Sequence, residues 1–183
     1  MSLKMPMFPL DVALSGHLAA TVIEVLLVDA GYQVVPLGIE RIVRELRTAD
    51  AERYRGIAPP RLRSLPDFFV IDPDSSQGFL VEVKYRRYLH SKLAEDLSTS
   101  QEHWAPLVLV LAVTEPPVEW TGAVRHLRLF RIEPRTPLTM AYFTGHGARM
   151  QDVFPRLAPK WPDATIRQAQ DFILRIAAEG DSR

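Results

Sequence analysis

Two strand-like runs joined by a dense turn constrain the fold of this 183-residue chain more than any other feature. Residues 68–72 and 79–85 are rich in aromatic and β-branched side chains, which favour strands. The six residues between them, Pro-Asp-Ser-Ser-Gln-Gly, are all typical of turns. The pattern therefore predicts a β-hairpin.

Three charged side chains fall on this hairpin. Asp67 opens the first strand, and Glu82 and Lys84 lie near the end of the second. Because strand side chains alternate between faces, Glu82 and Lys84 should point the same way, and the hairpin should bring Asp67 beside them. Two carboxylates next to an ammonium group can hold a hard divalent cation such as Mg²⁺, with several waters retained. Such a cation polarises a phosphodiester and activates a water, while the ammonium orients that water or stabilises developing charge.

Helices and further strands are predicted on both sides of the hairpin. Apolar residues recur at helical spacing over residues 14–30, where we expect Ser15 to cap the helix and Gly31 to end it. Residues 32–37 favour a strand, and Pro36 favours a sheet edge because it cannot donate to a ladder. The remaining expected elements are a short helix at 39–47, a basic loop at 48–63, a helix at 89–104, a buried strand at 107–113, a strand at 126–132 and a final helix at 164–178.

This order of elements, together with the charged motif, resembles the PD-(D/E)xK nuclease superfamily, which has the restriction-endonuclease-like fold. Pro66-Asp67 matches the first half of the motif and Glu82-Val83-Lys84 the second. The resemblance covers the first 113 residues and implies an α/β fold with an αβββαβ core, whose mixed central sheet is flanked by helices. We expect a nuclease-like domain over residues 1–145 and a C-terminal helical extension over residues 146–183, packed on the same domain.

The resemblance also implies roles for particular residues. Many members carry an acidic residue on the first helix near the metal, and Glu24 is the matching candidate. It stands in an apolar stretch, where a charge is costly to bury without a partner. The implied catalytic residues are then Asp67, Glu82, Lys84 and Glu24, of which the three carboxylates are the metal ligands. The implied cofactor is Mg²⁺, with Mn²⁺ as a substitute.

One branch of the family carries a glutamine and a tyrosine four residues apart on the helix after the lysine. Gln101 lies on the corresponding predicted helix, but Ala105 occupies the tyrosine position. This departure argues against transferring the exonuclease activity of that branch.

Charge distribution rather than net charge favours nucleic acid, in particular DNA, as the partner. The chain has 22 basic and 22 acidic residues, so its formal net charge is zero. Between Arg41 and Arg63, however, seven arginines face three acidic residues, and cations alternate with aromatic residues over residues 85–92. Such patches neutralise phosphates without reading bases. The candidate nucleic-acid contacts are His17, Arg61, Arg63, Arg86, Arg87 and Lys92.

Composition excludes several classes of protein. The chain has no cysteine, which excludes thiolate catalysis, disulfides and cysteine-ligated metal sites. Its longest apolar run, residues 107–113, is far shorter than the ~20 residues that span a bilayer. Residues 1–9 lack the features of a signal peptide. We therefore expect a soluble cytoplasmic protein with no membrane partner.

Three functions remain open at this stage. The first is a metal-dependent nuclease that hydrolyses phosphodiester bonds in DNA with structure-directed or relaxed sequence preference. The second is a catalytically inactive nucleic-acid-binding or scaffold module of the same fold. The third is an unrelated α/β protein in which Asp67, Glu82 and Lys84 form a surface salt-bridge cluster. Family members often cut both strands as dimers, so the resemblance also leaves a homodimer open.

Overall fold

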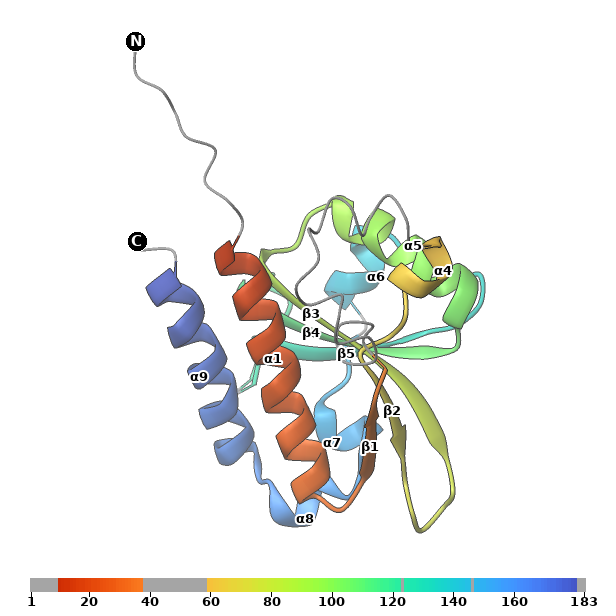
Figure 1. The fold of residues 1–183 in the computed structure, drawn as a ribbon. Coiled ribbons are helices and arrows are strands. Elements are labelled where there is room, and N and C mark those ends of the chain that lie inside the picture. Colours follow the sequence, from red (N-terminus) through yellow and green to blue (C-terminus); the bar gives the residue numbers. More distant parts are fainter. Residues whose placement is uncertain (1–9, 38–58, 123, 146, 181–183) are drawn as a thin grey trace.

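A five-stranded mixed sheet forms the centre of the α/β fold, with helices on both of its faces (Figure 1). The computed structural model describes residues 10–37, 59–122, 124–145 and 147–180. Neighbouring strands are antiparallel except for the third and fourth, which are parallel. In sheet order the strands are β1 (Gln33–Pro36), β2 (Phe68–Ile71), β3 (Gly78–Tyr88), β4 (Leu107–Glu115) and β5 (Leu127–Ile132).

The predicted hairpin is confirmed as β2 and β3. Phe68 pairs with Val81, and the turn closes through a 2.8 Å hydrogen bond from the backbone N–H of Asp72 to the carbonyl of Gln77. The carboxylate of Asp72 accepts the backbone N–H of Asp74 at 3.1 Å, as aspartate commonly does in turns. β3 continues to Tyr88, three residues beyond the predicted end, because it gains β4 as a second neighbour.

Alternating side chains of β3 divide the interior into two apolar layers. Val81 and Val83 pack against α1 (Leu10–Asp29), while α9 (Asp163–Gly180) lies beside α1 on the same face (Figure 1). The opposite face is covered by α5 (Lys92–Trp104) and by α6 (Met140–Gly145). Glu82 and Lys84 alternate with these valines along β3, so their side chains point toward the opposite face, which α5 covers.

Other sequence predictions are confirmed in the same way. β4 is buried on both faces over Leu107 to Val113, as its continuous apolar run predicts. β1 lies at the sheet edge, where the missing N–H of Pro36 breaks no ladder. Gly31 follows α1 with φ +88°, a conformation that glycine adopts without a Cβ penalty.

Several predicted boundaries were wrong. α1 begins at Leu10, so Ser15 lies inside the helix and does not cap it. The end of the expected basic loop is a helical turn, α4 (Pro60–Arg63), with proline at the first helical position, where its missing N–H costs nothing. The predicted helix at 39–47 and the rest of the basic loop lie outside the described residues. Three short helices, α6, α7 (Met150–Val153) and α8 (Leu157–Lys160), were not predicted.

The segment after α7 is tied to the hairpin and to the end of α1. The guanidinium of Arg156 pairs with the carboxylates of Asp72 and Asp74, and its backbone N–H donates to the hydroxyl of Tyr32 at 3.2 Å. Ile166 and other apolar residues of the C-terminal part join the layer beneath α1. None of the described helices is long and apolar enough to cross a membrane.

Candidate catalytic site

A cavity of about 250 Å³ opens on the sheet face that α4 and α5 cover. Glu82 and Lys84 reach it from β3, where they lie level with the buried residues Leu109 and Leu111 of β4. The other lining residues come from the two helices and the loop after α4, and they are Pro60, Arg63, Ser64, Asp96, Thr99 and Ser100. The cavity therefore joins an acidic and a basic group of the sheet to hydroxyl and guanidinium groups of the helices.

Asp67 is held against the same segment of β3 by two hydrogen bonds. Its Oδ2 accepts the backbone N–H of Val83 at 2.7 Å, between Glu82 and Lys84. In return, the carboxylate of Glu82 is hydrogen-bonded by the backbone of Asp67. The structure thus brings Asp67, Glu82 and Lys84 together, because β2 starts where the middle of β3 presents its charged face.

Burial gives Glu82 an unusual protonation equilibrium. The residue is only 5% exposed, and its Oε1 forms an ion pair with Nζ of Lys84. Burial raises the pKa of Glu82 to about 7; the ammonium of Lys84 acts to lower this pKa, and the carboxylate of Asp67 to raise it. A largely buried carboxylate with a second carboxylate beside it is not a solvated surface pair, which disfavours a surface salt-bridge cluster.

The pKa of Lys84 lies above its usual range. Burial acts to lower this pKa, but the carboxylate of Glu82 outweighs burial by charge and by hydrogen bonding, and Asp67 adds to the effect. Lys84 is therefore an ammonium group at neutral pH, with three N–H donors.

The paired carboxylates fit a hard divalent cation. Mg²⁺ commonly binds one or two carboxylates and retains several waters, so Asp67 and Glu82 are a sufficient protein ligand set. A second positive charge beside Glu82 would also offset the cost of burying its ionised form. The described residues contain no group of three or more histidine, aspartate or glutamate side chains placed to hold a metal.

Glu24, the third ligand implied by the resemblance, is not brought to this cavity. It lies on α1, which packs on the sheet face opposite to the one that Glu82 and Lys84 reach. Neither Glu24 nor Asp67 is a lining residue of the cavity, but Asp67 is hydrogen-bonded to β3 beside Glu82. The hairpin thus brings Asp67 and Glu82 together, and Asp96 adds a third carboxylate at the helical wall of the cavity.

The predicted nucleic-acid contacts are spread over several surfaces. Arg63 lines the cavity and is exposed, whereas Arg61 lies over the ring of Trp104 at 5.5 Å. Arg86 forms a 2.7 Å ion pair with Asp96, a lining residue. Like Arg61 and Arg86, the other three predicted contacts are not lining residues. Arg87 pairs with Glu115 at 2.9 Å, Lys92 is exposed at the start of α5, and His17 is exposed on α1.

The helical wall of the cavity was not predicted from the sequence. Asp96, Thr99 and Ser100 are three and four residues apart on α5, a spacing that places polar groups on one helix face. This spacing was the available signal, since Leu93 and Leu97 mark the adjoining buried face. Ser64 had no local signal, because its place depends on a 3.2 Å hydrogen bond from Nε1 of Trp104, 40 residues away.

Gln101 does not face the cavity. Its amide donates to the carbonyls of Glu133 at 3.0 Å and Thr136 at 2.8 Å, so it holds the loop after β5 against α5.

Comparisons with protein-family models, curated proteins and solved structures gave no match. The geometry of the cavity and of the residues around it is therefore the basis for the function proposed below.

Proposed function

We propose that the protein is a metal-dependent nuclease that hydrolyses phosphodiester bonds in DNA. The observation that supports this function is the group formed by the buried carboxylate of Glu82, the ammonium of Lys84 and the carboxylate of Asp67. Of these, Glu82 and Lys84 line a cavity beside helical hydroxyl groups. Apart from the helical turn α4 between β1 and β2, the element order α1, β1, β2, β3, α5, β4 supports the PD-(D/E)xK family with its restriction-endonuclease-like fold. A homodimer of such a chain would present one cavity to each DNA strand.

In this proposal Asp67 and Glu82 hold Mg²⁺, for which Mn²⁺ can substitute. When bound, the cation supplies charge stabilisation at the phosphate and lowers the pKa of a water. Lys84 uses one N–H donor on Glu82 and directs the others at the attacking water or a phosphate oxygen. Arg63, at the cavity wall, is placed to bind a neighbouring phosphate of the strand.

The proposed sequence preference follows from the kind of contact. Arginine contacts to phosphates position a nucleic acid but carry no base information. We therefore propose structure-directed or relaxed cleavage, in which the shape of the DNA decides which bond enters the cavity.

Cleavage assays with matched variants test this function. Asp67→Asn and Lys84→Met keep side-chain size but remove a charge, and each should lower Mg²⁺-dependent DNA cleavage by about 100-fold or more. Glu115→Gln and Lys160→Met make similar changes at exposed ion pairs outside the cavity and should leave cleavage unchanged. Thermal unfolding should show that all four variants fold. Cleavage that survives both Asp67→Asn and Lys84→Met would overturn the proposal.

A catalytically inactive nucleic-acid-binding or scaffold module is the second candidate. The ion pair between Glu82 and Lys84 favours it, because the ammonium already balances the buried carboxylate. Calorimetric titration with Mn²⁺ distinguishes the two functions. The nuclease should bind Mn²⁺ and lose that binding in Glu82→Gln, whereas DNA binding without Mn²⁺ binding at millimolar concentration would favour the inactive module.

A further inference from the structure

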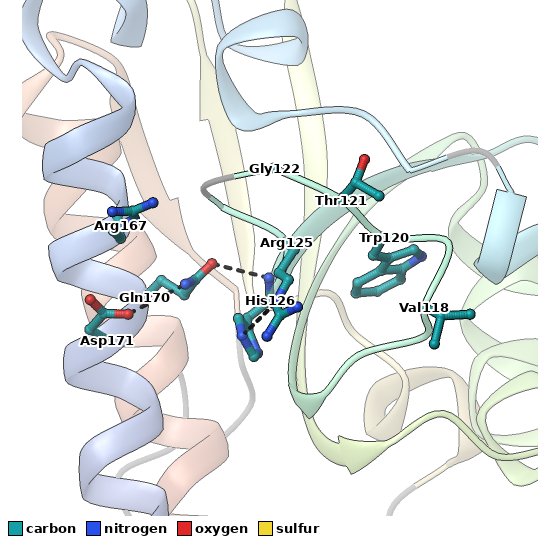
Figure 2. Close-up of a pocket in the computed structure, with 9 residues that line it drawn as sticks. All are labelled: Val118, Trp120, Thr121, Gly122, Arg125, His126, Arg167, Gln170 and Asp171. Atoms are coloured by element: carbon teal, nitrogen blue, oxygen red, sulfur yellow. Dashed lines mark hydrogen bonds between the residues drawn. The ribbon is translucent and has the colours of Figure 1, made fainter.

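A second cavity, of about 610 Å³, lies between α9 and the connection from β4 to β5 (Figure 2). It shares no lining residue with the cavity of Glu82 and Lys84. Its volume is in the range of small-molecule sites, and its lining is mostly polar. The lining residues are Val118, Trp120, Thr121, Gly122, Arg125, His126, Arg167, Gln170 and Asp171.

The wall formed by the β4–β5 connection is held in place by side chains. Arg128 of β5 donates to the carbonyls of Thr121 and Val124. The indole of Trp120, which is 4% exposed, donates to the carbonyl of Phe143 at 3.0 Å. These bonds anchor the backbone at Thr121 and Val124 and the side chain of Trp120.

His126 directs Arg125 toward the cavity. Nδ1 of His126 lies 2.9 Å from the carbonyl of Val113, which can only accept, so Nδ1 carries the proton. Nε2 is then an acceptor, and it receives the Nε–H of Arg125 at 3.3 Å. This bond uses one of the five N–H groups of Arg125 and leaves those of its two terminal nitrogens for a ligand. Within the described residues, no carboxylate forms an ion pair with Arg125.

The opposite wall is one face of α9. Gln170 is 4% exposed, and its Oε1 accepts the backbone N–H of His126 at 3.1 Å, which links the two walls (Figure 2). Arg167 precedes Gln170 by three residues and lines the same cavity. Asp171 is the acidic lining residue, and it lies 3.5 Å from Nε2 of Gln170. The lining therefore contains two guanidinium groups and one carboxylate, and this excess of positive charge favours an anion.

We propose that this cavity binds a phosphate group through Arg125 and Arg167. A carboxylate presents two oxygens in one plane, whereas a phosphate presents more oxygens in a tetrahedral arrangement and carries more negative charge at neutral pH, so it offers more acceptors to guanidinium groups on two sides. Arginines on two facing walls therefore suit a phosphate better than a carboxylate. A free nucleotide and a nucleic-acid backbone share this group. The site uses none of the residues of the proposed nuclease centre and does not depend on that function.

Calorimetric titration of the full chain tests the site. Inorganic phosphate and adenosine monophosphate should bind the wild type, and Arg125→Ala should weaken both by about tenfold or more, as expected for a lost charge-assisted hydrogen bond. Arg125→Lys should recover only part of the loss, because an ammonium cannot bind bidentately. Arg131→Ala removes an exposed charge of β5 outside the lining and should retain wild-type affinity.

Further probes identify the source of the phosphate. Tighter binding of adenosine monophosphate than of inorganic phosphate would support a free nucleotide as the ligand. Binding of a short single-stranded DNA that Arg125→Ala weakens would support a backbone phosphate. Acetate should bind far more weakly than phosphate, and equal binding would refute the phosphate assignment. Phosphate affinities that Arg125→Ala leaves unchanged, or no phosphate binding at millimolar concentration, would overturn the site. The two cavities share no lining residue, so the two proposals fail independently.

Discussion

Glu82 illustrates at the scale of one residue how burial prepares a carboxylate for a partner. In water a glutamate is ionised above about pH 4.5, but burial raises the pKa of Glu82 to about 7 even though Lys84 favours its charged form. The folded chain therefore keeps a proton on this group over a range in which the unfolded chain has released it. A divalent cation would reverse this preference, because it stabilises the ionised carboxylate.

This difference predicts a pH dependence of stability. Between about pH 4.5 and 7 the folded state binds more protons at Glu82 than the unfolded state, so the free energy of unfolding should fall as pH rises through that window. The raised pKa of Glu82 corresponds to a change of about 3 kcal/mol at most in the free energy of unfolding across this window. Urea unfolding should show this slope flattened in Glu82→Gln and, for the wild type, in the presence of Mg²⁺. Glu115→Gln, at an exposed position, should keep the slope. An identical slope in Glu82→Gln would contradict the assignment.

The three hairpin residues of the site could be predicted because their positions follow from local rules. The period of two along β3 and the turn at residues 73–78 place Asp67, Glu82 and Lys84 together. Glu24 was carried over from the resemblance, and no local rule fixes which face of the sheet its helix covers. Ser64 and the helical lining residues depend on how α4 and α5 pack, which the sequence pattern does not specify.

At the scale of elements, the prediction succeeded where one periodicity dominates. The apolar run of β4 and the helical spacing in α9 identify those elements without reference to tertiary structure. The prediction of elements failed where a few tertiary contacts stabilise a single helical turn. α4, α7 and α8 have four residues each, too few to show a period, and packing of buried residues such as Met150 and Leu157 holds the last two.

The packing of α9 makes a stability prediction with an internal control. Ile173 is 2% exposed in the layer shared with α1, whereas its neighbour Phe172 is 39% exposed. Ile173→Ala should lower the free energy of unfolding by about 2–4 kcal/mol, because it leaves a cavity in that layer. Phe172→Ala should cost less than about 1 kcal/mol. Urea unfolding measures both variants. Equal effects would show that α9 does not contribute its buried face to the same core.

At the scale of the whole molecule, the described fold contains two cavities with different chemistry and no lining residue in common. The acidic pair and Lys84 open toward α5, while the arginine-lined cavity lies between α9 and the β4–β5 connection. The first cavity has the groups needed to activate a water at a phosphodiester, and the second has groups that would hold a phosphate without reacting with it. The sequence indicated only the first, because His126 and Gln170 are 44 residues apart and meet only in the folded chain.

The central claim is that Asp67 and Glu82 hold a divalent cation on this face of the sheet. Diffraction from crystals soaked in Mn²⁺, with anomalous scattering recorded, tests it most directly. The account predicts an anomalous peak within about 2.0–2.6 Å of oxygens from both carboxylates, with Lys84 beside it. The peak should be absent from crystals of Glu82→Gln soaked in the same way. No peak at saturating Mn²⁺, or a peak that touches neither Asp67 nor Glu82, would contradict the account.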